Sequence, residues 1–207
     1  MRPSSQCVKT WQSLAAEAHH DARPARSLLS LADPPGPAVK RVAVVATEGA
    51  LDLDTDGAYL LPALERAGLA ATVVSWRDAS VSWEDFDLAV IRATWDYVER
   101  YRDFRRWLVE VEARTTLLNP AQVVAWSSDK IYLSEVSEAG FEIVPTTFFW
   151  PTEPLESRES AFAESGPWVV KPRVSAGCYE TERYETSERE AALAHVARLL
   201  EAGAEVM

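Results

Sequence analysis

Two lysines lie at positions where an ammonium group could bind a phosphate. Lys130 follows "SSD" at the start of a predicted helix, and Lys171 ends the apolar run "WVV". A lysine at the end of a buried strand is costly unless an anionic group meets it. The small residues Ser175, Ala176 and Gly177 follow Lys171 and would let the backbone approach a ligand closely. Since ammonium groups act as point charges for phosphates, the pattern predicts a phosphate clamp; for each lysine alone, an ordinary surface charge is the alternative.

The segment "RATWDY" carries a second group of polar side chains. Arg92 comes at the carboxyl end of a predicted buried strand, and Asp96 follows four residues later. In open parallel sheets, ligands bind outside the carboxyl ends of the strands. An arginine there can hold a carboxylate or phosphate with two hydrogen bonds. The alternative is a structural ion pair of Arg92 with Asp96 or with a neighbouring acid.

Other familiar ligand motifs are missing from the sequence. No G-x-G-x-x-G follows the first strand, and no G-x-x-x-x-G-K-[ST] occurs, which argues against a dinucleotide fold or a P-loop. The acids Asp52, Asp54 and Asp56 with Gly57 resemble the start of an EF-hand loop, but Ala63 stands at the twelfth position, where its last acidic ligand is needed. A solvated loop before the next helix is the better interpretation, and we predict no metal ligands.

Composition limits the classes of function. The chain has 207 residues, with 32 acidic and 21 basic side chains and a net charge of −11. An acidic chain lacks the basic surface of a nucleic-acid binder and the cationic face that anionic lipid requires. The sequence contains no apolar run of about 18 residues and no secretory signal, so we expect a cytoplasmic protein. Cys7 and Cys178 cannot build a disulfide framework, and we expect two unpaired thiols.

Residues 39–120 show strands that alternate with helices. Short continuous apolar runs such as "VAVVA" indicate buried parallel strands, and "RDFRRWLVEVEAR" has its apolar residues on one side of a helix. This alternation predicts a parallel-sheet α/β domain. Residues 1–38 contain "DPPGP", lack steady periodicity and are expected to form a disordered tail. Strands are predicted at 42–46, 71–76, 86–97 and 116–120, and helices at 58–69 and 102–114.

Residues 121–207 are expected to form a second, α+β unit. The runs "WVVKP" and "CYETERYE" indicate an antiparallel pair around "RVSAG", and Ser187 with Glu190 matches a capping box. "PTEPLESRES" is predicted to be a loop. The last residues, "AEVM", begin another strand and then the chain ends, so we expect an incomplete chain whose uncovered sheet edge favours self-association. Helices are predicted at 127–140 and 187–203, and a strand at 141–150.

In combination, these motifs resemble the ATP-grasp superfamily. The similarity rests on "DKIYLSEVSEAGFEIVPT" at 129–146, "WVVKP" at 168–172 and "SAGCYET" at 175–181. Within the superfamily the chain is similar to the glutathione-synthetase-like branch, and "RATWDY" with "NP" and "DK" resembles the ring-closing ligase of cycloserine biosynthesis. The resemblance covers about residues 40–207. It implies a pre-ATP-grasp α/β domain followed by the N-terminal part of an ATP-grasp domain.

The resemblance also implies a function. Members phosphorylate a carboxylate with ATP, and an amine then attacks the acylphosphate. By this resemblance, ATP would be contacted by Lys130, Lys171 and the loop residues Ser175, Ala176 and Gly177. A small-molecule substrate with a carboxylate would bind on the side that Arg92, Thr94 and Asp96 of "RATWDY" face.

The family's Mg²⁺ ligands would lie beyond Met207, the last residue of this chain. We therefore expect a carboxylate–amine ligase with weak or no activity as it stands, and whether this chain is itself an enzyme stays open. The alternative is a non-catalytic small-molecule-binding or interaction module that keeps the pre-ATP-grasp fold.

Overall fold

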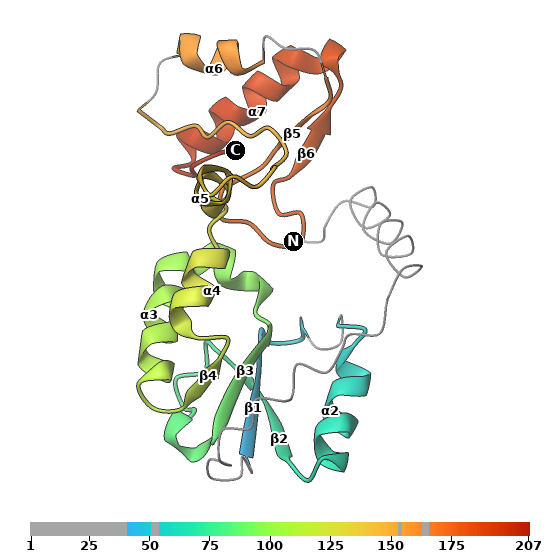
Figure 1. The fold of residues 1–207 in the computed structure, drawn as a ribbon, viewed down its shortest axis with the longest axis vertical. Helices are drawn as coiled ribbons and strands as arrows, with labels where there is room; N and C mark the ends of the chain where they lie inside the picture. The colour runs from blue at the N-terminus through green and yellow to red at the C-terminus, as the bar shows by residue number, and fades with distance from the viewer. Residues whose placement is uncertain (1–40, 51–53, 153–154, 163–165) are drawn as a thin grey trace.

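The computed structural model describes residues 41–50, 54–152, 155–162 and 166–207. Two units lie one above the other along the longest axis of the molecule (Figure 1). The lower unit holds a four-stranded sheet and the upper unit a two-stranded one. The predicted tail, residues 1–38, lies outside the described residues.

The larger sheet is fully parallel, with strand order β2-β1-β3-β4. The central strand β1 is apolar from Val42 to Ala46, and these residues are at most 1% exposed because β2 and β3 flank it and helices cover it. This confirms the predicted parallel α/β fold. Val44 and Leu117, which lie in two of the predicted strands, are buried, whereas Val90 in a third is only half-buried. The strands are β1 (Arg41–Ala46), β2 (Ala70–Ser75), β3 (Leu88–Ala93) and β4 (Thr116–Leu118).

Helices connect these strands and carry their apolar faces to the sheet. The helix α3 buries Phe104, Trp107, Leu108 and Val111, the residues of its predicted apolar stripe. Trp76 meets Phe104 edge to face at 5.2 Å, so aromatic rings form much of this core. Figure 1 shows α3 and α4 together beside β4 and β3, and α2 next to β2. The helices are α2 (Gly57–Arg66), α3 (Tyr101–Glu112) and α4 (Ala121–Ser127), with 3-10 turns η3 (Trp83–Asp85) and η4 (Trp95–Arg100).

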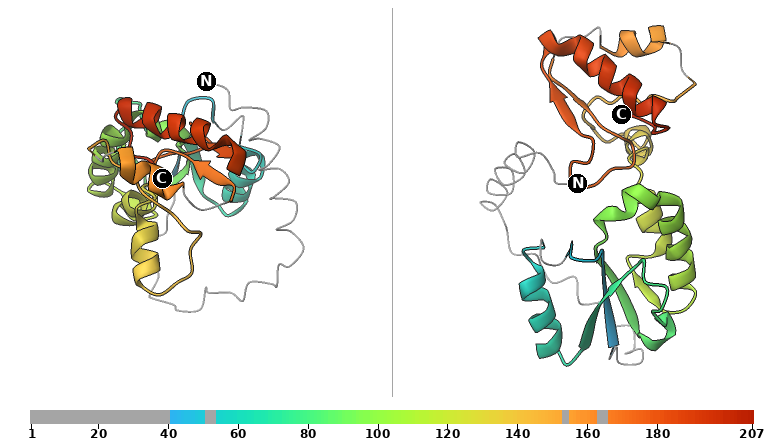
Figure 2. Two further views of the ribbon diagram at one scale, coloured as in Figure 1. Left: turned by 90° about the horizontal axis from the view of Figure 1, so that it is seen from above. Right: turned by 180° about the vertical axis from the view of Figure 1, so that it is seen from behind.

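The upper unit is an antiparallel pair of strands covered by a helix. Trp168, Val169 and Val170 pair with Tyr184, Arg183 and Glu182. The helix α7 buries Val196, Leu199 and Leu200 against this pair. Figure 2 shows the ribbon of α7 next to the two strands, from above and from behind. Val206 bridges Phe149 and Pro172, which places "AEVM" in an extended segment as predicted. The elements are α5 (Tyr132–Glu138), α6 (Leu155–Ala161), β5 (Trp168–Val170), β6 (Glu182–Tyr184), η5 (Thr186–Glu188) and α7 (Arg189–Glu201).

Four local predictions for the second unit are wrong. Residues 141–150 form no strand except for the bridge at Phe149, and the region predicted as the loop "PTEPLESRES" contains the helix α6. The helix predicted at 127–140 is divided, because α4 ends at Ser127 and α5 begins at Tyr132. The capping box is formed by Glu185 and Glu188 instead of Ser187 and Glu190.

The expectation of unpaired thiols is also wrong for Cys178, which is disulfide-bonded. A count of two cysteines excludes a framework of several bridges, but it does not exclude a single one. Cys7 lies outside the described residues.

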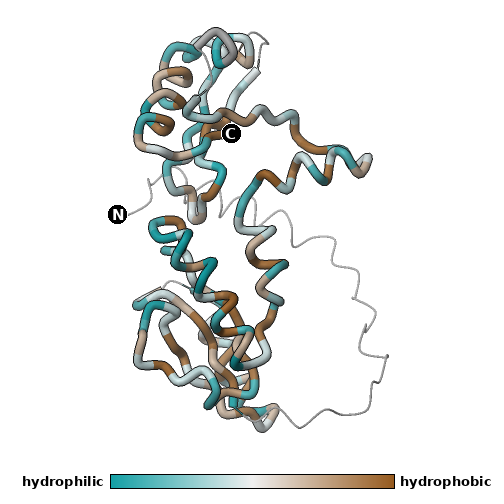
Figure 3. The backbone as a smooth tube through the Cα atoms, turned by 90° about the vertical axis from the view of Figure 1, so that its left-hand side faces the viewer, coloured by the Kyte–Doolittle hydropathy of each residue, from teal (hydrophilic) through white to brown (hydrophobic). Residues whose placement is uncertain are grey.

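In Figure 3 hydrophobic and hydrophilic residues alternate along both units. Within the described ranges, no helix is long and apolar enough to cross a membrane.

Candidate functional site

Lys130 and Lys171 lie together in the upper unit, although they come from different elements. Lys130 lies two residues before α5, and its backbone N–H donates to the carbonyl of Arg173 over 3.1 Å. Its ammonium group donates to the carbonyl and hydroxyl of Ser175 over 2.8 and 2.9 Å, and to the Arg173 carbonyl over 3.4 Å. Lys171 directly follows β5, where backbone hydrogen bonds to Met207 hold it. The structure therefore brings together Lys130, Lys171 and Ser175.

Burial destabilises the charged form of both ammonium groups. Burial lowers the pKa of Lys130 to about 8, with a further contribution from the charge of Lys171 and an opposing one from Asp129. Burial also lowers the pKa of Lys171. Among the described residues, no carboxylate lies within ion-pair distance of either group. Two half-buried cations without a paired anion are the arrangement expected of a site for an anionic ligand.

The loop after Ser175 is fixed at both ends. Ser175 is only 8% exposed and is held by Lys130. At the other end, the Glu180 carboxylate accepts a hydrogen bond from Arg198 of α7 over 2.6 Å. Gly177 and Cys178 between them have φ values of 57° and 61°, in the left-handed region that glycine adopts at least cost.

Arg92 takes part in a structural ion pair. Its guanidinium makes two hydrogen bonds to Asp54, of 2.7 and 2.8 Å, and a third of 2.8 Å to Asp56. The side chain of Asp54 is only 7% exposed, and the hydrogen bond from Arg92 holds its pKa below the usual value. The acid partners are thus the residues of the "DTD" turn, and Asp96 is not among them.

The Asp96 carboxylate accepts hydrogen bonds from three residues that follow the ends of β1 and β2. Trp76 donates its indole N–H over 2.7 Å and Arg77 its guanidinium over 2.8 Å, and the Thr47 hydroxyl also donates. Burial alone would raise the pKa of Asp96, but these hydrogen bonds outweigh it, and the pKa is lowered. Thr94 lies beside it and is 6% exposed. Asp96 thereby ties the carboxyl ends of β1 and β2 to η4.

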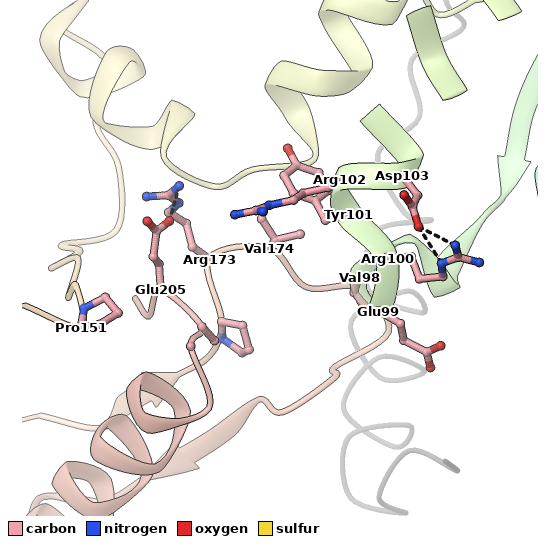
Figure 4. A pocket seen from close by; sticks show the side chains of 13 residues that line it. Val98, Glu99, Arg100, Tyr101, Arg102, Asp103, Pro151, Arg173, Val174 and Glu205 are labelled. Carbon is pink, nitrogen blue, oxygen red and sulfur yellow. Dashed lines mark hydrogen bonds and ion pairs between the residues drawn. The ribbon is translucent and has the colours of Figure 1, made fainter. Parts of the chain in front are cut away.

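A cleft of about 690 Å³ lies between the two units, and its lining includes none of the predicted site residues. One wall is formed by residues 98–103 of η4 and α3, and the other by 172–174 and 203–205 (Figure 4). Arg102 has no ion-pair partner among the described residues, whereas Arg100 is paired with Asp103. The volume suits a small ligand.

Sequence reasoning missed Arg173, which organises one wall of this cleft. Its guanidinium pairs with Asp129 over 2.7 and 3.0 Å and also contacts Glu205. Its backbone N–H donates to the carbonyl of Glu205 over 2.8 Å. Arg173 therefore joins the start of the upper unit to the chain's last residues, and it carries the carbonyl that binds Lys130. The signal was its place two residues after Lys171, shortly beyond the end of β5.

Comparison with known proteins finds relatives for both the sequence and the fold. Residues 42–119 match the family described as the D-cycloserine synthetase DcsG N-terminal domain. The chain is 34% identical over 172 residues to the cycloserine biosynthesis protein DcsG of Streptomyces lavendulae. The resemblance to ATP-grasp ligases of the DcsG type is confirmed. That match covers 80% of this chain and 57% of the relative, so the chain spans less than two thirds of the relative's length.

Solved structures give the same result for the fold. The crystal structure of D-cycloserine synthetase DcsG matches with a TM-score of 0.72 and 33% identity, over 80% of this chain and 57% of that one. A RimK-domain ATP-grasp protein from Sphaerobacter thermophilus matches with a TM-score of 0.59 and 21% identity, over 80% of this chain and 62% of that one. At that identity the second match supports the fold alone.

Proposed function

We propose that this chain is the nucleotide-binding part of an ATP-dependent carboxylate–amine ligase. The observation that carries the proposal is the pair Lys130 and Lys171, two half-buried ammonium groups with no carboxylate at ion-pair distance among the described residues. In a protein interior such a pair is unfavourable until an anion joins it. A polyphosphate satisfies both charges at once, and the similarity to DcsG and other ATP-grasp ligases supports ATP as that anion.

The residues of the site would divide the work as follows. Lys171 would contact a phosphate directly, since its ammonium group donates to no described residue. Lys130 already donates to Ser175, so it would hold the loop and a phosphate together. The backbone of Ala176 and Gly177 would approach the phosphates, because neither residue presents a large side chain. When bound, ATP would supply the phosphoryl group that activates a carboxylate for attack by an amine.

The substrate side is proposed at Arg92, Thr94 and Asp96, at the carboxyl end of β3. Arg92 already pairs with Asp54, and Asp96 already pairs with Arg77. The contribution of Arg92 and Asp96 would therefore be to stabilise the shape of this edge of the sheet. The substrate is proposed to be a small molecule with a carboxylate. Mg²⁺ is expected for the family, and no group of three or more His, Cys, Asp or Glu side chains in the described ranges could hold it.

Calorimetric titration with ATP tests the proposal. Lys171→Ala is expected to weaken binding about tenfold or more, because a charge-assisted hydrogen bond contributes roughly 1.5–3 kcal/mol. Lys171→Arg should restore part of the affinity, since a planar fork does not replace a compact ammonium group. Arg66→Ala in α2 removes a positive charge far from the site and serves as the control. Equal affinity of the wild type and Lys171→Ala would refute the phosphate clamp.

Two further properties remain proposals. Phe141, Val144 and Val169 are 68%, 82% and 50% exposed, which supports self-association through the upper unit. Light scattering at increasing concentration would detect it. A cytoplasmic location stays a prediction, and fractionation of expressing cells tests it.

A further inference from the structure

One contact joins the predicted substrate side to the loop of the nucleotide site. The hydroxyl of Tyr97, in η4, donates to the carbonyl oxygen of Ser175 over 3.4 Å. The same carbonyl accepts the ammonium group of Lys130 over 2.8 Å. The first residue of the loop is therefore held from both units, by a tyrosine of the lower one and a lysine of the upper one.

The position of the Tyr97 hydroxyl is set by the lower unit. Its ring stacks on Phe104 with centroids 5.1 Å apart, and Tyr101 lies 6.2 Å away. Tyr97 also follows Asp96, whose three hydrogen bonds fix η4 to the sheet. Because the ring is held by packing, the hydroxyl presents a fixed donor to whatever approaches from the upper unit.

The cleft places this contact at a boundary between the units. Val98 lines one wall and Val174 the other, and Figure 4 shows both beside the cleft. Tyr97 and Ser175 are the next residues along these two segments, and their hydrogen bond joins the two walls beside the lining residues. The loop that follows, up to Glu180 and its bond to Arg198, begins at this point.

We infer that Tyr97 is a positioning residue that sets the start of the loop at Ser175 from the lower unit. Its hydroxyl and Lys130 restrain one carbonyl from two directions, and the backbone of Ala176 and Gly177 is thereby presented in a defined place. The inference rests on the proposed function for its consequence, namely nucleotide affinity. The restraint on the loop itself exists without any ligand and is tested separately.

Hydrogen–deuterium exchange on the protein without nucleotide tests the restraint. The variant Tyr97→Phe removes only the hydroxyl and keeps the stack with Phe104, so it is expected to fold. The amides of Tyr179 and Thr181, which donate within the loop over 2.9 and 3.2 Å, report its order. We expect peptides spanning the loop to exchange at least twofold faster in Tyr97→Phe, while peptides of β1 and β3 stay unchanged.

Tyr101→Phe is the matched control. This substitution removes the hydrogen bonds of the Tyr101 hydroxyl with Ala125 and Ser128, at 3.3 and 3.2 Å. Neither partner belongs to the loop. Its loop peptides should exchange as in the wild type. All three proteins are compared in the same redox state, so that the disulfide at Cys178 contributes equally. Loop exchange in Tyr97→Phe equal to that of the wild type, or an equal rise in Tyr101→Phe, would overturn the inference.

Titration with ATP then separates this inference from the proposed function. If the wild type binds ATP, Tyr97→Phe should raise its dissociation constant about two- to fivefold, the effect of one long neutral hydrogen bond, and Tyr101→Phe should not. An unchanged constant in Tyr97→Phe would overturn the link to the nucleotide. If the wild type binds no ATP, the proposed function fails, and faster loop exchange in Tyr97→Phe alone still supports the positioning role.

Discussion

Lys130 gives a pH dependence whose sign can be worked out in advance. Burial and the neighbouring Lys171 lower the pKa of Lys130 to about 8 in the folded protein, from its ordinary value of 10.5. Below pH 8 both the folded and unfolded states carry the charge. Between about 8 and 10.5 the folded state releases the proton while the unfolded state keeps it. Since the unfolded state then binds more protons, the free energy of unfolding rises with pH across this window.

The size of the effect follows from the same values. At about 1.4 kcal/mol per pH unit, a fully buried group would contribute roughly 3 kcal/mol. The Lys130 side chain is only half-buried, so solvent screening reduces this to about 1–2 kcal/mol. Urea denaturation of the wild type and of Lys130→Met at pH 7, 8, 9 and 10 measures it. The wild type should gain about 1–2 kcal/mol relative to the variant between pH 7 and pH 10.

Nucleotide affinity should respond to the same titration with the opposite sign. The charged ammonium group attracts phosphate, so the wild type should bind ATP more weakly as the pH rises above 8. Lys130→Met should bind weakly throughout and show less of this pH dependence. A stability difference between the two proteins that stays constant from pH 7 to 10 would refute the reasoning, because it would mean that Lys130 is neither buried nor close to Lys171.

Three further substitutions test the hydrogen bonds around the site by urea denaturation at pH 7. Asp96→Asn should lower the free energy of unfolding by about 2 kcal/mol, since it weakens three hydrogen bonds to a charged acceptor; an unchanged value would contradict its role in joining β1, β2 and η4. Arg92→Lys should cost about 1–2 kcal/mol, because lysine cannot make the two-point contact with Asp54, and no cost would mean that the pair is not formed in solution. Tyr184→Phe should cost about 1 kcal/mol by removing the hydroxyl that donates to Glu182 over 2.9 Å and lies 3.0 Å from Nδ1 of His195, and a stabilised variant would contradict it.

The lower unit was predictable because its signals are local and redundant. The run from Val42 to Ala46 is apolar on both faces of a strand, which only a parallel sheet covered by helices can bury. The stripe of α3, including Phe104 and Trp107, repeats at helical spacing. The strand predicted at 141–150 was wrong because the apolar residues of this segment are typical of a strand. Pro145, however, lacks a backbone N–H donor, and within this segment only Phe149 forms a β-bridge.

The candidate site was predictable only in part, for a different reason. Lys130 and Lys171 could be chosen from residue type and position. Nothing in the sequence, however, indicates that these two lysines, 41 residues apart, lie close together in the folded protein. The pairing of Arg92 was open for the same reason: Asp54, 38 residues earlier, is its partner, whereas Asp96, the acid close in sequence, belongs to another network. Side-chain partners across the sheet depend on topology, and motif order alone does not specify it.

The acidic composition of the chain makes two lysines without a carboxylate partner unusual. With 32 acids and 21 bases, a cation at an arbitrary surface position has many carboxylates to pair with. Arginines such as Arg92 and Arg173 do so, each with two acids. Lys130 and Lys171 instead lie near each other, in a chain whose net charge of −11 would hold a nucleotide away at long range. An acidic protein that binds a polyanion must provide a local site where cations are gathered and left unpaired, and of the described residues these two lysines fit that requirement.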